Sequence, residues 1–137
     1  MFFEGDEKRW LYRVSGGIVC LCRTRADGHR QVFGFRFNAD ILGIEAGGEY
    51  ALSAQALGKV ELKCLPFNSL REQAANEAEI ALHLYTAISS ELANTRVFLE
   101  MLCGHGSTER VAYFLLDLLR RDPGRIPRSL SLPMNSI

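Results

Sequence analysis

Apolar and polar residues alternate in short runs over the first half of the chain, and this period changes near Pro66. The short runs are rich in β-branched and aromatic residues and are bounded by glycine, aspartate, asparagine or serine, which is typical of β-strands. The predicted strands are Trp10–Val14, Ile18–Arg23, Gln31–Phe37, Tyr50–Leu57 and Val60–Leu65. Many short, evenly spaced strands predict a sandwich or a closed barrel, with a jelly roll as the favoured form.

Two local patterns add detail to this β half. Asp27-Gly28 lies between two predicted strands and predicts a tight hairpin, because glycine accepts the positive φ that such turns need. Phe33, Phe35 and Phe37 alternate with a glycine and an arginine, so we expect them to form one buried face of a strand.

After Pro66, apolar residues recur every three to four positions, which predicts helices. The expected helices are Phe67–Ala75, a long one from Asn76 to about Cys103, and one that begins at Ser107 and ends before Asp122-Pro123-Gly124. We expect the side chain of Asn76 to cap the long helix and Gly104 to end it.

The long helix carries two apolar stripes. The first stripe, here called the seam, has residues spaced alternately by four and three: Ala81, Tyr85, Ile88, Leu92, Thr95, Leu99 and Leu102. This spacing predicts packing against another helix, as in a coiled coil. The second stripe, Ile80, Leu84, Ala87 and Phe98, is expected to cover the β half. The alternative is that a single chain buries both stripes, because three heptads are close to the shortest repeat that indicates a coiled coil.

The composition is that of a globular protein, with 47% hydrophobic and 23% charged residues among 137 and no net charge. No apolar run reaches the roughly 20 residues that cross a bilayer, and the N-terminus does not resemble a signal peptide. We therefore expect a cytoplasmic protein without a membrane partner. Basic residues gather near the C-terminus, where residues 120–137 include four arginines and one acid.

Four segments carry the most specific pattern: residues 27–32 (Asp-Gly-His-Arg-Gln-Val), 40–43 (Asp-Ile-Leu-Gly), 50–57 (Tyr-Ala-Leu-Ser-Ala-Gln-Ala-Leu) and 108–116 (Thr-Glu-Arg-Val-Ala-Tyr-Phe-Leu-Leu). Together they resemble the Crp/Fnr family of bacterial transcription regulators, and within it the FixK-like branch. The resemblance implies a mainly β fold followed by helices. Its parts would be a cyclic-nucleotide-binding-like jelly roll over residues 1–75, a dimerisation helix over 76–103, and a hinge with the start of a truncated winged helix-turn-helix domain over 104–137.

The resemblance also implies partners. A homodimer would form through Tyr85, Ile88, Leu92, Thr95, Leu99 and Leu102, with a hinge at Gly104 and Gly106. DNA and RNA polymerase are implied as partners of the full-length protein. Residues 130–134 resemble the strand that precedes the helix-turn-helix, and the sequence ends three residues later. We therefore expect the recognition helix to be absent from this chain, and DNA binding to need it.

A cyclic-nucleotide site of this family needs an arginine for the phosphate and an acid for the ribose. The corresponding positions are Leu52, directly before Ser53-Ala54, and Ile44, directly after Gly43, with Glu45 next in the chain. An apolar side chain cannot balance a buried phosphate. We therefore expect a degenerate effector pocket at Gly43, Ile44, Glu45, Leu52, Ser53 and Ala54 that does not bind cyclic AMP.

Cofactor and metal sites are not expected. The cysteine run of an iron–sulfur regulator is missing, and Cys20, Cys22 and Cys64 are interpreted as buried structural thiols. Cys103, at a helix end, is expected to be exposed, and a redox role for it stays open. The three histidines are expected to be surface or capping residues, namely His29 in a turn, His83 on the long helix and His105 in a loop.

An enzyme is not expected either. A jelly-roll enzyme would show a catalytic or metal-binding spacing such as Ser-His-Asp, paired carboxylates or His-X-His, and none is present. The remaining alternative to a regulator is a stand-alone jelly-roll module that binds a small ligand.

Overall fold

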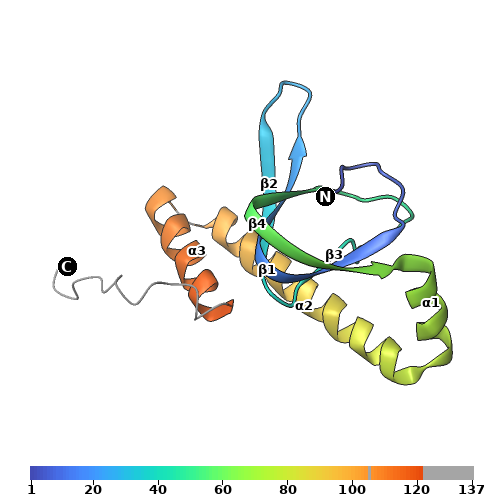
Figure 1. Ribbon diagram of the computed structural model, residues 1–137. Coiled ribbons are helices and arrows are strands. Elements are labelled where there is room, and N and C mark those ends of the chain that lie inside the picture. Colours follow the sequence, from blue (N-terminus) through green and yellow to red (C-terminus); the bar gives the residue numbers. More distant parts are fainter. Residues whose placement is uncertain (105, 122–137) are drawn as a thin grey trace. The chain divides into compact units, whose positions relative to one another are not determined.

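The computed structural model describes residues 1–104 and 106–121, in which antiparallel strands are followed by helices (Figure 1). The strands are β1 (Trp10–Thr24), β2 (Arg30–Arg36), β3 (Ile41–Leu42) and β4 (Ser53–Pro66). The helices are α1 (Phe67–Asn76), α2 (Ala78–Cys103) and α3 (Ser107–Arg121). The chain divides into two compact units, Met1–Glu100 and Met101–Ile137.

Strand β1 is the centre of the β half, because β2, β3 and β4 all pair with it in antiparallel fashion. The predicted division of β1 into Trp10–Val14 and Ile18–Arg23 is wrong, and so is the division of β4 into two strands. The ladder between β1 and β4 shifts register on either side of Gly16 and then continues. Gly17 has φ +89°, and a Cβ there would lie 2.4 Å from the Lys59 carbonyl oxygen. The glycines therefore bend the strands instead of ending them.

The core lies inside this roll of strands. Its buried residues are Phe2, Val14, Val19, Leu21, Leu42, Tyr50 and Ala54. Phe2 stacks on Tyr50 with ring centroids 3.8 Å apart, and the Tyr50 hydroxyl donates to the Trp10 carbonyl at 2.5 Å. The N-terminal segment therefore packs against the roll through Phe2.

The expected buried face of three phenylalanines is only partly present. Phe37 is buried, but Phe33 and Phe35 are half-buried, and the intervening Arg36 is 3% exposed. Leu21 pairs with Gly34, whereas Cys22 pairs with Val32, so Phe33 is the extra residue of a β-bulge. A bulge interrupts the alternation of side chains along a strand, which is why the simple period failed here.

The helices follow the predicted order, and α1, which continues directly from β4, confirms the short helix. α2 ends at Cys103 and α3 begins at Ser107, as predicted, whereas the predicted stop at residues 122–124 lies outside the described residues. The expected cap is wrong, because Asn76 belongs to α1 and its amide donates to the Glu72 carbonyl at 3.0 Å. Among residues 1–104 and 106–121, no helix has the length and hydrophobicity to span a membrane.

Strand β3 occupies a segment for which no strand was predicted. Tyr12 pairs with Leu42 and Arg13 with Ile41, which extends the sheet on one side of β1. The chain enters β3 through Ala39, which has φ 75° and is the one non-glycine residue with positive φ in the described part of the chain. The left-handed region is unfavourable for a residue with a Cβ. Hydrogen bonds to β1 stabilise this turn, since the Ala39 N–H donates to the Val14 carbonyl at 2.8 Å.

Candidate effector pocket and dimer seam

A cavity of about 330 Å³ lies between the roll and α2 and is here called the effector pocket. Four of the predicted pocket residues line it: Gly43, Ile44, Glu45 and Leu52. Ser53 and Ala54 are not among its lining residues. Ser53 Oγ accepts a hydrogen bond from the Glu4 backbone at 2.9 Å, and Ala54 belongs to the core. The helix contributes Ile88, Leu92 and Thr95.

Glu45 is committed to the protein itself. Its carboxylate accepts the Ala51 backbone N–H at 3.2 Å and lies 4.0 Å from Lys8 Nζ. The Lys8 side chain is fully buried and donates to the Glu45 carbonyl at 2.5 Å. Glu45 therefore fixes the loop before Tyr50, which leaves it poorly placed to bind a ribose hydroxyl.

The charges of the effector pocket disfavour an anion. The ionisable residues of its lining are one cation, Arg36, and two carboxylates, Glu45 and Glu91. Arg36 is paired with Glu91 in a two-pronged contact, through Nε at 2.8 Å and through Nη2. A cyclic phosphate would have to compete with a carboxylate already seated on the guanidinium.

We predict that cyclic AMP and cyclic GMP do not bind at micromolar concentration. Their phosphate would enter a pocket whose one cation is already paired with Glu91, and Leu52 offers it no charge. Isothermal calorimetry on the chain tests this prediction. Micromolar affinity for either nucleotide would contradict it.

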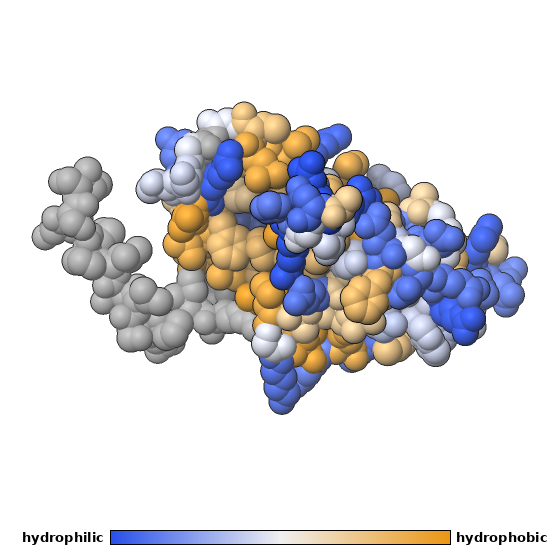
Figure 2. Space-filling model, turned by 90° about the horizontal axis from the view of Figure 1, so that it is seen from above, coloured by the Kyte–Doolittle hydropathy of each residue, from blue (hydrophilic) through white to orange (hydrophobic). Residues whose placement is uncertain are grey.

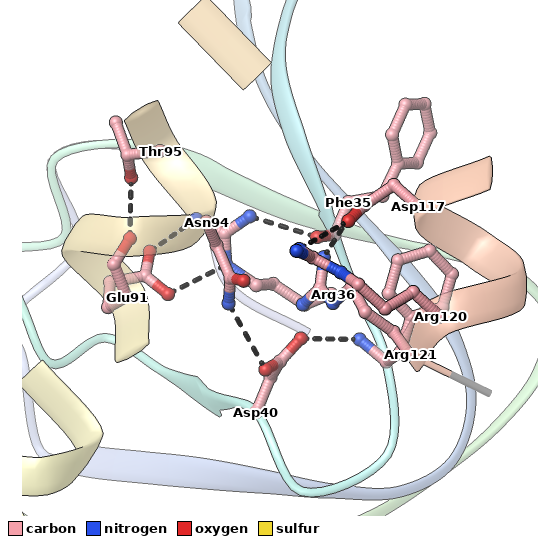
Figure 3. A network of polar contacts seen from close by, with 10 residues as sticks. Phe35, Arg36, Asp40, Glu91, Asn94, Thr95, Asp117, Arg120 and Arg121 are labelled. Atoms are coloured by element: carbon pink, nitrogen blue, oxygen red, sulfur yellow. Dashed lines mark hydrogen bonds and ion pairs between the residues drawn. The ribbon is translucent and has the colours of Figure 1, made fainter. Parts of the chain in front are cut away.

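The Arg36–Glu91 pair belongs to a wider polar network between the strands and α2 (Figure 3). Arg36 Nη1 also donates to the Phe35 carbonyl at 2.9 Å. Asn94 lies one turn beyond Glu91, and its amide is 3.4 Å from Asp40 Oδ1. Gly34 makes room for this arrangement, since a Cβ there would lie 2.7 Å from Arg36 Nη1. The network holds α2 against the roll beside the pocket.

Neither Arg36 nor Glu91 was singled out in the sequence. A usable signal did exist, because Glu91 and Asn94 continue the four-three spacing of the second stripe between Ala87 and Phe98. Polar residues that interrupt an apolar stripe indicate buried polar contacts across it.

The two stripes of α2 differ in burial. Ile80, Leu84, Ala87 and Phe98 are half-buried, and Phe98 packs edge-on against Phe35 with centroids 6.4 Å apart. The exposed fractions along the seam are 67% for Tyr85, 51% for Ile88, 53% for Leu92, 57% for Leu99 and 41% for Leu102. Within Met1–Glu100 the roll therefore covers the second stripe and leaves the seam uncovered, which favours the seam as a surface for another helix. On the face seen in Figure 2, hydrophobic residues form several patches, while the end with α1 is mainly hydrophilic.

The remaining candidates do not come together as a site. Cys20 and Cys22 are buried and free, and burial raises the pKa of the Cys20 thiol while Arg30 partly opposes that effect. Cys103 is exposed as expected, but Cys64, expected to be buried, is exposed on β4. No metal-binding group of three or more His, Cys, Asp or Glu residues occurs in the part of the chain that the structure describes.

The two histidines that the structure describes lie on different parts of the chain. His29 is exposed in the hairpin turn, 3.3 Å from Asp27, and His105 lies outside the described residues. His83 lines a second cavity between α2 and the strands. Gly104 and Gly106 form the predicted hinge. A Cβ at either position would have no atom of the described residues within 4 Å, apart from its chain neighbours.

Comparisons with known proteins agree with the fold and the motifs. No family model matches the chain. The nitrogen fixation regulation protein FixK of Azorhizobium caulinodans is 34% identical over 111 residues, which are 81% of this chain and 45% of that protein. The FixK of Rhizobium meliloti is 30% identical over 135 residues, which are 98% of this chain and 60% of that protein.

Among solved structures, FixK2 from Bradyrhizobium japonicum superposes with a TM-score of 0.80 at 28% identity, over 88% of this chain and 61% of that one. The chain thus spans about half the length of the curated relatives that it matches. With its jelly roll, its long helix and these similarities, this chain belongs to the Crp/Fnr family and is similar to the FixK members of that family.

Proposed function

We propose that this chain is the sensor and dimerisation portion of a bacterial Crp/Fnr-type transcription regulator that does not respond to a cyclic nucleotide. The observation that carries the proposal is the exposed seam. A helix that already covers the roll with one stripe presents a second apolar stripe, at heptad spacing, to solvent. Two such stripes can bury each other in a parallel two-fold dimer. The regulator names of the FixK relatives favour this function over a stand-alone binding module or an enzyme.

The position of the effector pocket suggests how a signal would travel. Ile88, Leu92 and Thr95 line the pocket and also belong to the seam. A ligand that moved these residues would change how the two α2 helices cross, because a packed helix pair shifts between discrete arrangements. The Arg36–Glu91 pair would set the resting position of the helix.

In a longer protein the movement would continue through Gly104 and Gly106 to α3. Glycine accepts backbone angles that other residues avoid, so these two positions suit a hinge. α3 lies in the segment that resembles the start of the winged helix-turn-helix domain. DNA and RNA polymerase would then be partners of that longer, homodimeric protein, and this chain would set the distance between its two DNA-reading elements.

We predict that residues 1–137 alone bind DNA weakly and without sequence preference. Their basic stretch contains Arg120, Arg121, Arg125 and Arg128, which can neutralise at most about four phosphates per subunit. Such binding should disappear as salt rises toward about 0.2 M. Gel retardation with a palindromic site and a scrambled duplex of equal length measures both effects.

The result that would overturn the proposal is tight, sequence-selective retardation by this chain alone. Another surface of the chain would then read DNA. Selective binding that appears only when a helix-turn-helix of the family follows residue 137 is the result that the proposal expects.

A further inference from the structure

A second cavity, here called the basic cavity, lies between the strands and the helices α1 and α2. Its volume is about 650 Å³, within the range of small-molecule sites. Strands β1, β3 and β4 form one wall, and α1 with the first half of α2 forms the other. Much of the lining on both walls is apolar, and it includes Ile41, Leu65, Leu70, Ile80 and Leu84. Glu91 and Ile41 border both cavities.

Three basic side chains face the basic cavity. Arg13 on β1 and Lys63 on β4 are directly opposed cross-strand neighbours, and His83 comes from α2 on the other wall. Within residues 1–104 and 106–121, none of the three has an ion pair or a side-chain hydrogen bond. Like charges at opposed positions of a sheet destabilise it. All three residues are exposed at the cavity, and a negative group between Arg13 and Lys63 would relieve their repulsion.

The acids of the same cavity are already engaged. Glu91 is paired with Arg36. Asp40 accepts the Phe37 backbone N–H at 2.8 Å and lies 3.4 Å from the Asn94 amide. Neither carboxylate forms an ion pair with Arg13 or Lys63, so these two cations have no acidic partner in the lining.

We infer that the basic cavity binds a small organic anion with an apolar tail, such as a free medium-chain carboxylate. The charged end would lie between Arg13 and Lys63 and accept a hydrogen bond from the His83 ring. The tail would lie along Leu65, Leu84 and Ile80. This site is separate from the effector pocket and does not depend on the proposed function.

Calorimetric titration with decanoate at pH 7 tests the inference, with decanol as a neutral probe of equal chain length. Decanoate should bind, and decanol about tenfold more weakly or not at all, because only the carboxylate uses the two cations. The Arg13→Gln/Lys63→Gln variant should lose about tenfold in decanoate affinity. Removal of two like charges from adjacent strands should not unfold the chain, which circular dichroism verifies.

The matched control is Arg25→Gln/Lys59→Gln, which removes two exposed cations that do not line this cavity and should leave decanoate affinity unchanged. A second readout locates the site. Decanoate should shift the proton resonances of the His83 ring and leave those of His29 in place. Equal affinity for decanol, no binding of decanoate, an unchanged affinity in the Arg13/Lys63 variant, an equal loss in the control variant or an unshifted His83 would each overturn the inference.

Discussion

Replacement of Leu92 and Leu99 by glutamate is expected to leave the chain monomeric. Both leucines lie on the seam with more than half of their surface exposed in a single chain, at 53% and 57%. In a two-fold dimer the double variant would put four carboxylates into one apolar interface, and unpaired buried charges are strongly unfavourable. Sedimentation velocity should show the unmodified chain at twice 15.3 kDa and the variant at 15.3 kDa.

The matched control is Ser89→Glu/Ala93→Glu, which adds the same charge to α2 at exposed positions outside both stripes. This variant should remain dimeric. A Leu92/Leu99 variant that stays dimeric would mean that the seam is not the interface.

Loss of the Glu91 carboxylate is expected to destabilise the fold by about 3 kcal/mol. The Arg36 side chain is 3% exposed. Glu91→Ala would remove its carboxylate partner and leave its hydrogen bond to the Phe35 carbonyl. The partial exposure of Glu91, 25%, places the expected loss at the low end for a buried pair. Urea unfolding followed by circular dichroism measures the change.

Two comparisons separate the buried pair from a general loss of charge. Arg36→Met/Glu91→Leu replaces both partners by apolar groups and should recover most of the stability, since no charge is then left unpaired. Glu7→Ala removes an exposed partner of Arg9, 70% accessible, and should change little. A Glu91→Ala variant as stable as Glu7→Ala would contradict the structural role of the network.

The periodicity of apolar residues was sufficient to predict the helices. The spacing of apolar residues after Pro66 predicted α1, the end of α2 and the start of α3, and it separated the two stripes that differ in burial. Where glycine enables a bend, the same approach failed. The predicted strands were divided at Gly16-Gly17, but Gly17 lies against the backbone of Lys59 and Val60 in a continuous ladder, and only the partner strand reveals this.

The polar part of the site could not be predicted because its contacts are distant in sequence. Arg36 and Glu91 are 55 positions apart, and Lys8 and Glu45 are 37 apart. Local propensity describes both pairs as ordinary surface charges. Local motifs therefore singled out Gly43, Ile44, Glu45 and Leu52, which line one cavity, whereas the paired charges beside them were missed.

We expect the seam to form a parallel dimer that sets the spacing of two DNA-reading elements. The most direct measurement is gel retardation with a longer protein in which a helix-turn-helix of the family follows residue 137. We predict tight binding to a palindrome whose half-sites lie about one helical turn apart. Insertion of about half a turn should reduce binding to that of a single half-site, because the second reader would then face the wrong side of the duplex. Equal affinity for both spacings would contradict the claim.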